Sequence, residues 1–97
     1  MKKNVKVRIV RGELNYFKNS DTGAYDKPMT KIYYLVKQEE SDRVVGSSYK
    51  YCFKNGDLRE ILKPYTEHCQ EVLVDIAERP TENGTKDVIE TINNKQL

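Results

Sequence analysis

The clearest pattern in the chain is an alternation of hydrophobic and polar residues with a period of two, which is typical of strands that bury one face. Gly12 interrupts the first such segment and predicts a bulge or a bend, so we expect one long curved strand there. A mainly β structure is therefore expected. The alternation covers five segments, residues 4–18, 29–38, 43–53, 71–77 and 87–92.

Turn-forming residues separate these segments. The run from Asn19 to Gly23 is rich in turn residues, and Pro28, which cannot donate to a sheet ladder, closes the same loop. Asn83-Gly84 predicts a hairpin because both residue types accept a positive φ. The polar residues 93–97 are expected to form a frayed tail.

One short helix is predicted between the third and fourth strands, over residues 57–63. Asp57 is a suitable N-cap, and Glu60, three positions later, gives an approximate capping box. Leu58 and Leu62 have helical spacing, whereas Pro64 is expected to end the helix after less than two turns.

This order of elements predicts a mainly β fold, a five-stranded OB-like Greek-key barrel whose short helix lies between strands 3 and 4 and plugs the open end. Closing the barrel would remove most exposed strand edges. An SH3-like barrel, or a sheet with one helix packed across it, is the alternative. The 97 residues allow a single domain, 1–97, and because so small a core leaves a thin margin of stability, a homodimer is expected.

Several classes of site lack the residues they need. The chain has two cysteines, Cys52 and Cys69, and one histidine, His68, so a structural zinc site is excluded and no cofactor is expected. Two buried thiols are a better interpretation than a disulfide in a reducing compartment. No stretch approaches the roughly 20 apolar residues that span a bilayer, and the basic start lacks a signal-peptide core, so a soluble intracellular protein is expected.

Catalytic motifs are also missing from the sequence. It contains no Gly-x-Ser-x-Gly, no Walker-type lysine and no His-Glu-x-x-His. His68 and Cys69 are adjacent, and neighbours on a strand point to opposite faces, which is a poor geometry for a dyad. We therefore expect a protein that is not an enzyme.

The small net charge of +2 hides an asymmetry. Residues 1–54 contain twelve Lys and Arg against six Asp and Glu, whereas residues 55–97 contain five against nine. Cations that come from several segments and meet on one face are the electrostatic signature of a nucleic-acid binder. Charges that merely solvate the outer faces of strands explain the same counts equally well.

The aromatic residues favour the first interpretation. Eight of the nine Tyr and Phe precede the helix, where the surplus cations also lie. Tyr33 alternates with Lys31, and Tyr25 lies beside Lys27, which suits bases that stack on a ring while a cation meets the phosphate. Tyr16 is a third ring expected to be exposed. We expect Tyr34 and Phe53 to lie in the core, and the pattern leaves Tyr49 and Tyr51 open.

Single strands are the expected partner because the only predicted helix is short and acidic, unlike a recognition helix for duplex DNA. Seven cations are candidates for phosphate contacts, and four rings are candidates for base stacking. The cations are Arg8, Arg11, Lys18, Lys27, Lys31, Lys37 and Lys50, and the rings are Tyr16, Tyr25, Tyr33 and Tyr51.

The sequence resembles the small OB-fold single-stranded-DNA-binding proteins of phages and plasmids, the filamentous-phage type in particular. The residues behind this are the Lys6–Ile9 strand, the Asp26-Lys27-Pro28 loop end and the 72–92 hairpin. The resemblance implies a dimer that coats single strands without sequence preference in the cytoplasm of a bacterial host, during replication, recombination or transfer of a mobile element. Two alternatives are an RNA-binding OB domain and a protein-interaction module that docks through a sheet edge or the acidic 39–42 turn.

Overall fold

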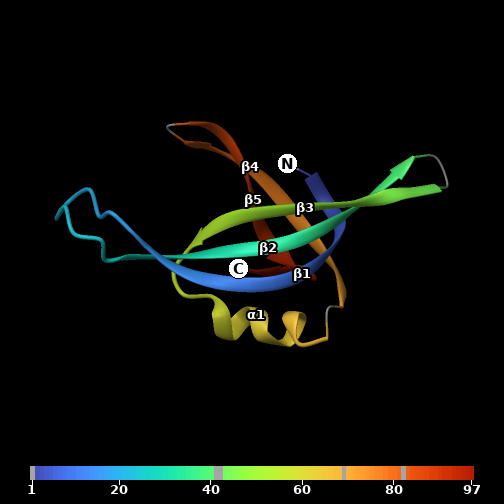
Figure 1. Cartoon of the computed structure of the whole chain (residues 1–97), viewed down its shortest axis with the longest axis horizontal. Coiled ribbons are helices and arrows are strands. Elements are labelled where there is room, and N and C mark those ends of the chain that lie inside the picture. The colour runs from blue at the N-terminus through green and yellow to red at the C-terminus, as the bar shows by residue number, and fades with distance from the viewer. Residues whose placement is uncertain (1, 41–42, 69, 82) are drawn as a thin grey trace.

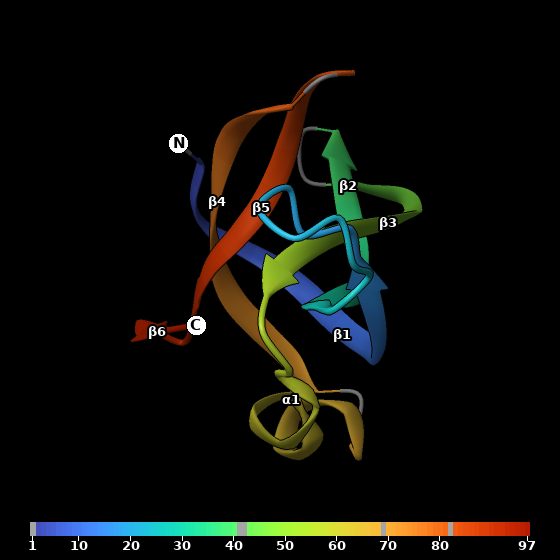
Figure 2. The same cartoon turned by 90° about the vertical axis from the view of Figure 1, so that its left-hand side faces the viewer.

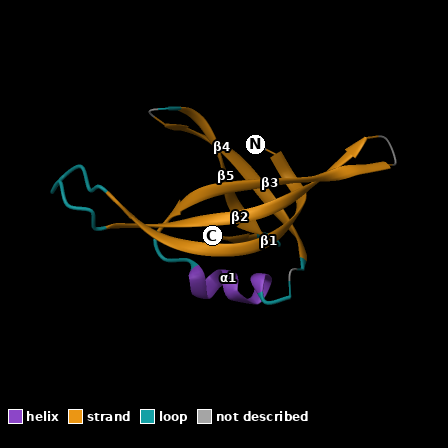
Figure 3. Cartoon of the chain, in the orientation of Figure 1, coloured by secondary structure: helices purple, strands orange, loops and turns teal. Residues whose placement is uncertain are grey.

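The computed structural model describes residues 2–40, 43–68, 70–81 and 83–97. Six antiparallel strands form one sheet in the order β3-β2-β1-β4-β5-β6, and one short helix packs against it (Figures 1 and 3). A mainly β fold is thus confirmed. The elements are β1 (Lys2–Phe17), β2 (Lys27–Glu40), β3 (Arg43–Asn55), α1 (Arg59–Thr66), β4 (Glu71–Thr81), β5 (Gly84–Ile92) and β6 (Lys95–Gln96).

The expected five-stranded closed barrel is wrong in two respects. The sheet has six strands, and it is open, because β3 and β5 contact each other without being neighbours in a hydrogen-bonded ladder of the described residues. Strong curvature nevertheless brings these two strands close together (Figure 2). The structure therefore has a groove where a closed barrel would have a seam.

β1 is the single curved strand that the sequence predicts, but its bulge is not at Gly12. The pairing with β2 shifts between Ile9 and Arg11, so Val10 is the extra residue. Gly12 has a different role, since a Cβ there would lie 2.9 Å from Leu62 Cδ1 on α1. The missing side chain lets the helix approach the sheet.

The core lies on the concave inner face of the sheet, where the strands supply aliphatic side chains and α1 supplies Leu62. Tyr34 is buried there, as expected, and burial raises the pKa of its hydroxyl to about 12. The buried core residues are Val7, Ile9, Ile32, Tyr34, Cys52, Leu62, Val72, Val74, Ile76, Ile89 and Ile92.

The start of α1 is held by a buried threonine and not by the predicted capping box. Leu58 occupies the N-cap position without a side-chain cap, and its N–H donates to Thr30 Oγ1 at 2.8 Å. The same hydroxyl donates to the Gly56 carbonyl at 2.7 Å. Asp57 instead accepts from the N–H and guanidinium of Arg59, which lowers its pKa to about 2.

Pro64 lies inside α1 and does not end it, contrary to expectation. A proline inside a helix removes one backbone hydrogen bond. Leu62 and Tyr65, on either side of Pro64, both pack against the core. This packing accounts for the extra turn, because most helix stability in proteins comes from tertiary contacts.

The predicted frayed tail is also wrong. Asn93 and Asn94 have φ angles of 49° and 67°, which form a tight turn that returns the chain as β6. Leu97 packs against the core, and its N–H donates to the Glu90 carbonyl at 3.0 Å. The hairpin between β4 and β5 is confirmed, with Thr81 paired to Gly84.

Replacing Gly12 by Val should destabilise the protein by about 1–3 kcal/mol, because the new side chain overpacks the contact with Leu62. Urea unfolding followed by circular dichroism measures the change in free energy of unfolding. In a Leu62→Ala background the space is vacant, so the same substitution should cost clearly less. Equal costs in both backgrounds would show that the approach of α1 is not what requires glycine.

Candidate nucleic-acid interface

The outer face of β1, β2 and β3 carries cations and aromatic rings at neighbouring positions. Gly12 faces α1, so by strand alternation Arg11 points to the opposite side of the sheet. Arg11 pairs in register with Tyr33, and Tyr33 pairs with Tyr51. Two residues further along the same face of the sheet, Lys31 on β2 pairs with Phe53 on β3. We call Arg11, Lys31, Tyr33, Tyr51 and Phe53 the aromatic–cation face.

Lys31 is the centre of this face, because its ammonium group lies among three rings. Its Nζ is 4.3 Å from the ring centroid of Tyr51, 4.9 Å from that of Tyr33 and 5.7 Å from that of Phe53. All three distances are within the range of cation–π attraction, about 6 Å. The cation is therefore held over a continuous aromatic surface.

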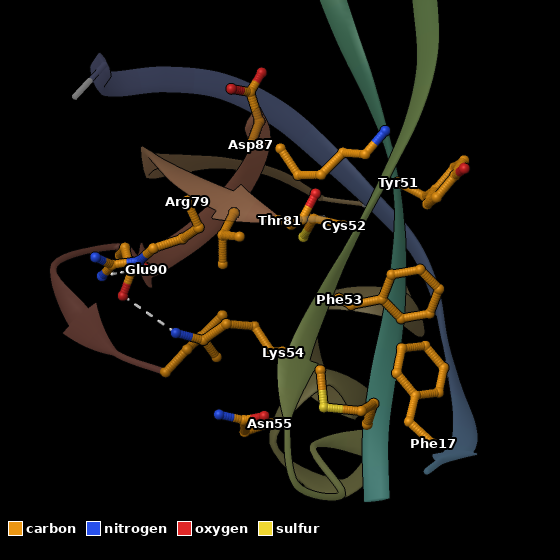
Figure 4. Close-up of a pocket in the computed structure, with 14 residues that line it drawn as sticks. Phe17, Tyr51, Cys52, Phe53, Lys54, Asn55, Arg79, Thr81, Asp87 and Glu90 are labelled. Carbon is orange, nitrogen blue, oxygen red and sulfur yellow. Dashed lines mark hydrogen bonds and ion pairs between the residues drawn. The ribbon is translucent and has the colours of Figure 1, made fainter. Parts of the chain in front are cut away.

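The rings form a row that extends across β3 to the end of β1. The centroids are 6.2 Å apart for Tyr33 and Tyr51, 5.9 Å for Tyr51 and Phe53, and 5.0 Å for Phe53 and Phe17. In Figure 4 Tyr51, Phe53 and Phe17 lie along the same side of β3. Tyr51 is 57% exposed and Phe17 38%, so solvent reaches both rings.

Tyr33 links the two cations of the face. Arg11 Cζ lies 4.4 Å from the centroid of the Tyr33 ring. Lys31, two residues before Tyr33 on the same face of β2, approaches this ring as well. Hydrogen bonding to Lys31, and next to Arg11, lowers the pKa of the Tyr33 hydroxyl. The same contacts raise the pKa of both cations, which therefore stay charged.

The structure brings together four of the eleven predicted site residues, namely Arg11, Lys31, Tyr33 and Tyr51. Three others belong to the same outer face at its two ends. Lys27 pairs with Phe17 near the start of β2, while Arg8 and Lys37 lie toward β4.

Four predicted residues lie elsewhere. Tyr16 is exposed but points to the α1 side of β1, because it alternates with Phe17. Lys50 lies on the other face of β3 from Tyr51 and lines a small hollow with Tyr34 and Lys86. Lys18 and Tyr25 belong to the loop between β1 and β2, where Tyr25 is 72% exposed.

Sequence reasoning assigned Phe53 to the core, and this is wrong. In β3 the side chain that enters the core is Cys52, which pairs with Ile32, so Phe53 points outward. Phe53 and Phe17 were therefore missed as members of the site. The sequence offers no signal for this, because Tyr49 and Tyr51 share the parity of Phe53 and only the structure shows that both are exposed.

The groove between β3 and β5 adjoins the aromatic row, with a volume of about 710 Å³. Lys54 on β3 and Arg79 on β4 both contact Glu90 there, with N to O distances of 3.2 and 2.9 Å (Figure 4). Burial alone would raise the pKa of Glu90, but hydrogen bonds from both cations outweigh this and lower it. Glu90 thus neutralises one of the two positive charges of Lys54 and Arg79.

Other kinds of site find little support in the described part of the chain. No group of three or more His, Cys, Asp and Glu among those residues could hold a metal ion. No helix of the described ranges is long and apolar enough to cross a membrane. Cys52 is a buried free thiol whose pKa is raised by burial, whereas Cys69 and the centre of the 39–42 turn lie outside the described residues.

Comparison of the chain with known protein families, curated proteins and solved structures gives no significant match. The chemistry of the aromatic–cation face must therefore be inferred from its own side chains.

Tyr33 should ionise below the usual tyrosine pKa of about 10, because Lys31 and Arg11 stabilise the phenolate. Because the pKa of Tyr33 is lower in the folded than in the unfolded protein, the free energy of unfolding increases as the pH rises through this pKa.

An ultraviolet titration of tyrosinate absorbance tests the lowered pKa. Tyr33→Phe should remove the absorbance change that occurs below the usual pH range of tyrosine, and Lys31→Gln should move that absorbance change to higher pH. Identical titrations for Tyr33→Phe and the wild type would contradict the geometry.

Proposed function

We propose that this protein binds single-stranded DNA without sequence preference, as a non-enzymatic homodimer that coats the DNA of a phage or another mobile element. The observation that carries the proposal is the convergence of Arg11 and Lys31 with Tyr33, Tyr51 and Phe53 on one face of the sheet. These five side chains come from three consecutive strands, β1, β2 and β3.

The chemistry of the face suits unpaired bases. Every base has a π-face, so stacking on an exposed ring is tolerant of sequence and is worth about 1–3 kcal/mol per base. Tyr51 offers an exposed ring to such a base. Arg11, over the neighbouring ring of Tyr33, is exposed to solvent and would leave its ion pair with Glu13, 3.5 Å away, to meet a phosphate. Duplex DNA would hide its bases from these rings.

The order of the elements supports the same proposal. The strand order β3-β2-β1-β4-β5, with α1 between β3 and β4 in the chain, is the arrangement we would expect from an OB-type fold that has not closed between β3 and β5. OB folds bind oligonucleotides on the face of strands 2 and 3, between the loop that joins strands 1 and 2 and the loop that joins strands 4 and 5. Here the 18–26 loop projects from one end of that face (Figure 1).

A protein-interaction module is the second candidate, and the free edge of β3 favours it. In the described part of the sheet this edge has no hydrogen-bonded neighbour, so a strand of a partner could extend the sheet there. Such a protein would form a complex of fixed stoichiometry with its partner and would ignore oligonucleotides. RNA binding uses the same stacking chemistry, and RNA is distinguished through contacts to the 2′-hydroxyl.

Fluorescence titration with oligo-dT should show binding that weakens with salt, with a slope of about −0.7 per phosphate neutralised. Tyr51→Ala should lower the affinity about 5- to 150-fold, which corresponds to the loss of one stacked base. Lys31→Gln should weaken binding and make the slope shallower by about 0.7. The matched control is Lys63→Gln, which removes an exposed cation from α1 on the other side of the sheet.

No binding of oligo-dT to the wild type below tens of micromolar at low salt would refute the proposal. Equal effects of Lys31→Gln and Lys63→Gln would show that binding follows net charge and not the aromatic–cation face. Parallel titration with oligo-U distinguishes DNA from RNA, and the proposal requires the tighter binding to be to oligo-dT. Light scattering of the free protein tests the homodimer.

A further inference from the structure

A second group of charges lies on the same outer face, where β1 runs between β2 and β4. Lys37 Nζ donates to Glu71 Oε2 at 2.7 Å, and Arg8 pairs in register with Leu35 on one side and Glu71 on the other. Lys6 lines the same small cavity of about 180 Å³. We call Lys6, Arg8 and Lys37 the cation cluster.

The carboxylate of Glu71 lies near all three cations of the cluster. Hydrogen bonding from Lys37, and then the charges of Lys37, Lys6 and Arg8, lower the pKa of Glu71, so it stays ionised. The cluster keeps a surplus of two positive charges even with Glu71 in place. The side chains of Lys37 and Glu71 are 37% and 35% exposed, so an anion from solvent can reach both.

The β1 bulge connects this cluster to the aromatic–cation face. Arg8 and Arg11 are three positions apart, and strict alternation would place them on opposite faces of the sheet. Because Val10 is an extra residue, Arg8 pairs with Leu35 and Arg11 with Tyr33, and both point outward. A strand of nucleic acid stacked on Tyr33 and Tyr51 therefore has a positively charged continuation toward Lys37.

We propose that the cation cluster is a phosphate subsite and that Glu71 occupies the place of the phosphate in the free protein. The inference rests on the proposed function, since the ligand is the backbone of the bound single strand. A phosphodiester and a carboxylate each carry one negative charge and accept charge-assisted hydrogen bonds from Lys and Arg. Lys37 exchanges Glu71 for a phosphate on binding, and the displaced carboxylate repels the incoming strand.

The test is the effect of Glu71→Gln on binding, because the proposal gives it an unusual sign. Loss of the carboxylate should tighten binding of oligo-dT about fivefold, the effect expected from removing one like charge about 4 Å from a phosphate in water. It should also make the salt slope steeper, because the freed cations exchange counterions for phosphates. Glu60→Gln, which removes an exposed carboxylate from α1 behind the sheet, is the matched control and should leave affinity nearly unchanged.

An oligomer of abasic sites with the same length separates phosphate contacts from stacking. The gain from Glu71→Gln should appear with this probe as well as with oligo-dT, and Arg8→Gln should weaken both. A gain confined to oligo-dT, or equal effects of Glu71→Gln and Glu60→Gln, would overturn the inference while leaving the proposed function intact. Absence of oligo-dT binding by the wild type would instead refute the proposed function.

Thermal unfolding by circular dichroism checks that these variants are folded. Glu71 lies at the exposed start of β4 and its ion pair is on the surface, so Glu71→Gln should unfold within a few degrees of the wild type. Glu71→Ser also removes the carboxylate and should give the same gain in affinity. A gain with one variant and not with the other would show that the charge of Glu71 is not responsible.

Discussion

The extra residue in β1 is the feature on which both faces of the sheet depend. Before it, Val7 and Ile9 point into the core and Arg8 points out; after it, Gly12 points in and Arg11 points out. If Val10 were paired in a regular ladder instead of bulging, Arg11 would point into the core and Gly12 out of it, because a one-residue slip inverts every side chain that follows. The bulge thus lets a hydrophobic inner face and a cationic outer face coexist along one curved strand.

Aromatic rings on the outer face offset the repulsion between two neighbouring cations. Arg11 and Lys31 both approach Tyr33, and two cations so close together would repel each other. The π-faces of Tyr33, Tyr51 and Phe53 attract the cations, and Glu13 forms an ion pair with Arg11 at 3.5 Å. The face therefore combines exposed rings with two cations, one of which is paired with a carboxylate.

The strands could be predicted from the sequence, because alternation is a local property of each segment. The choice of face was harder in β3, where both parities carry groups that could be buried. The small thiol of Cys52 fits beside Ile32 in the core, and only the tertiary structure shows that Phe53 does not. Likewise, the Asn93-Asn94 turn was missed because its polar residues are equally typical of a disordered end.

The candidate site could be predicted in part. The alternation of Tyr33 with Lys31 was visible in one strand, but the approach of Arg11 depends on the bulge and the contact of Phe17 with Phe53 depends on strand register. Sheet closure was predicted from the need to protect edges, whereas in the described residues β3 and β5 touch without forming a ladder and β5 pairs with the short β6. Non-local pairing decides these features, and periodicity does not report it.

We expect the outer face of β1, β2 and β3 to bind the single strand. Two-dimensional amide NMR of the labelled protein, titrated with oligo-dT, tests this most directly. We expect the largest shift changes at Arg11, Lys31, Tyr33 and Tyr51, with little change along α1. Changes concentrated on α1, or spread evenly over every charged surface, would contradict the claim.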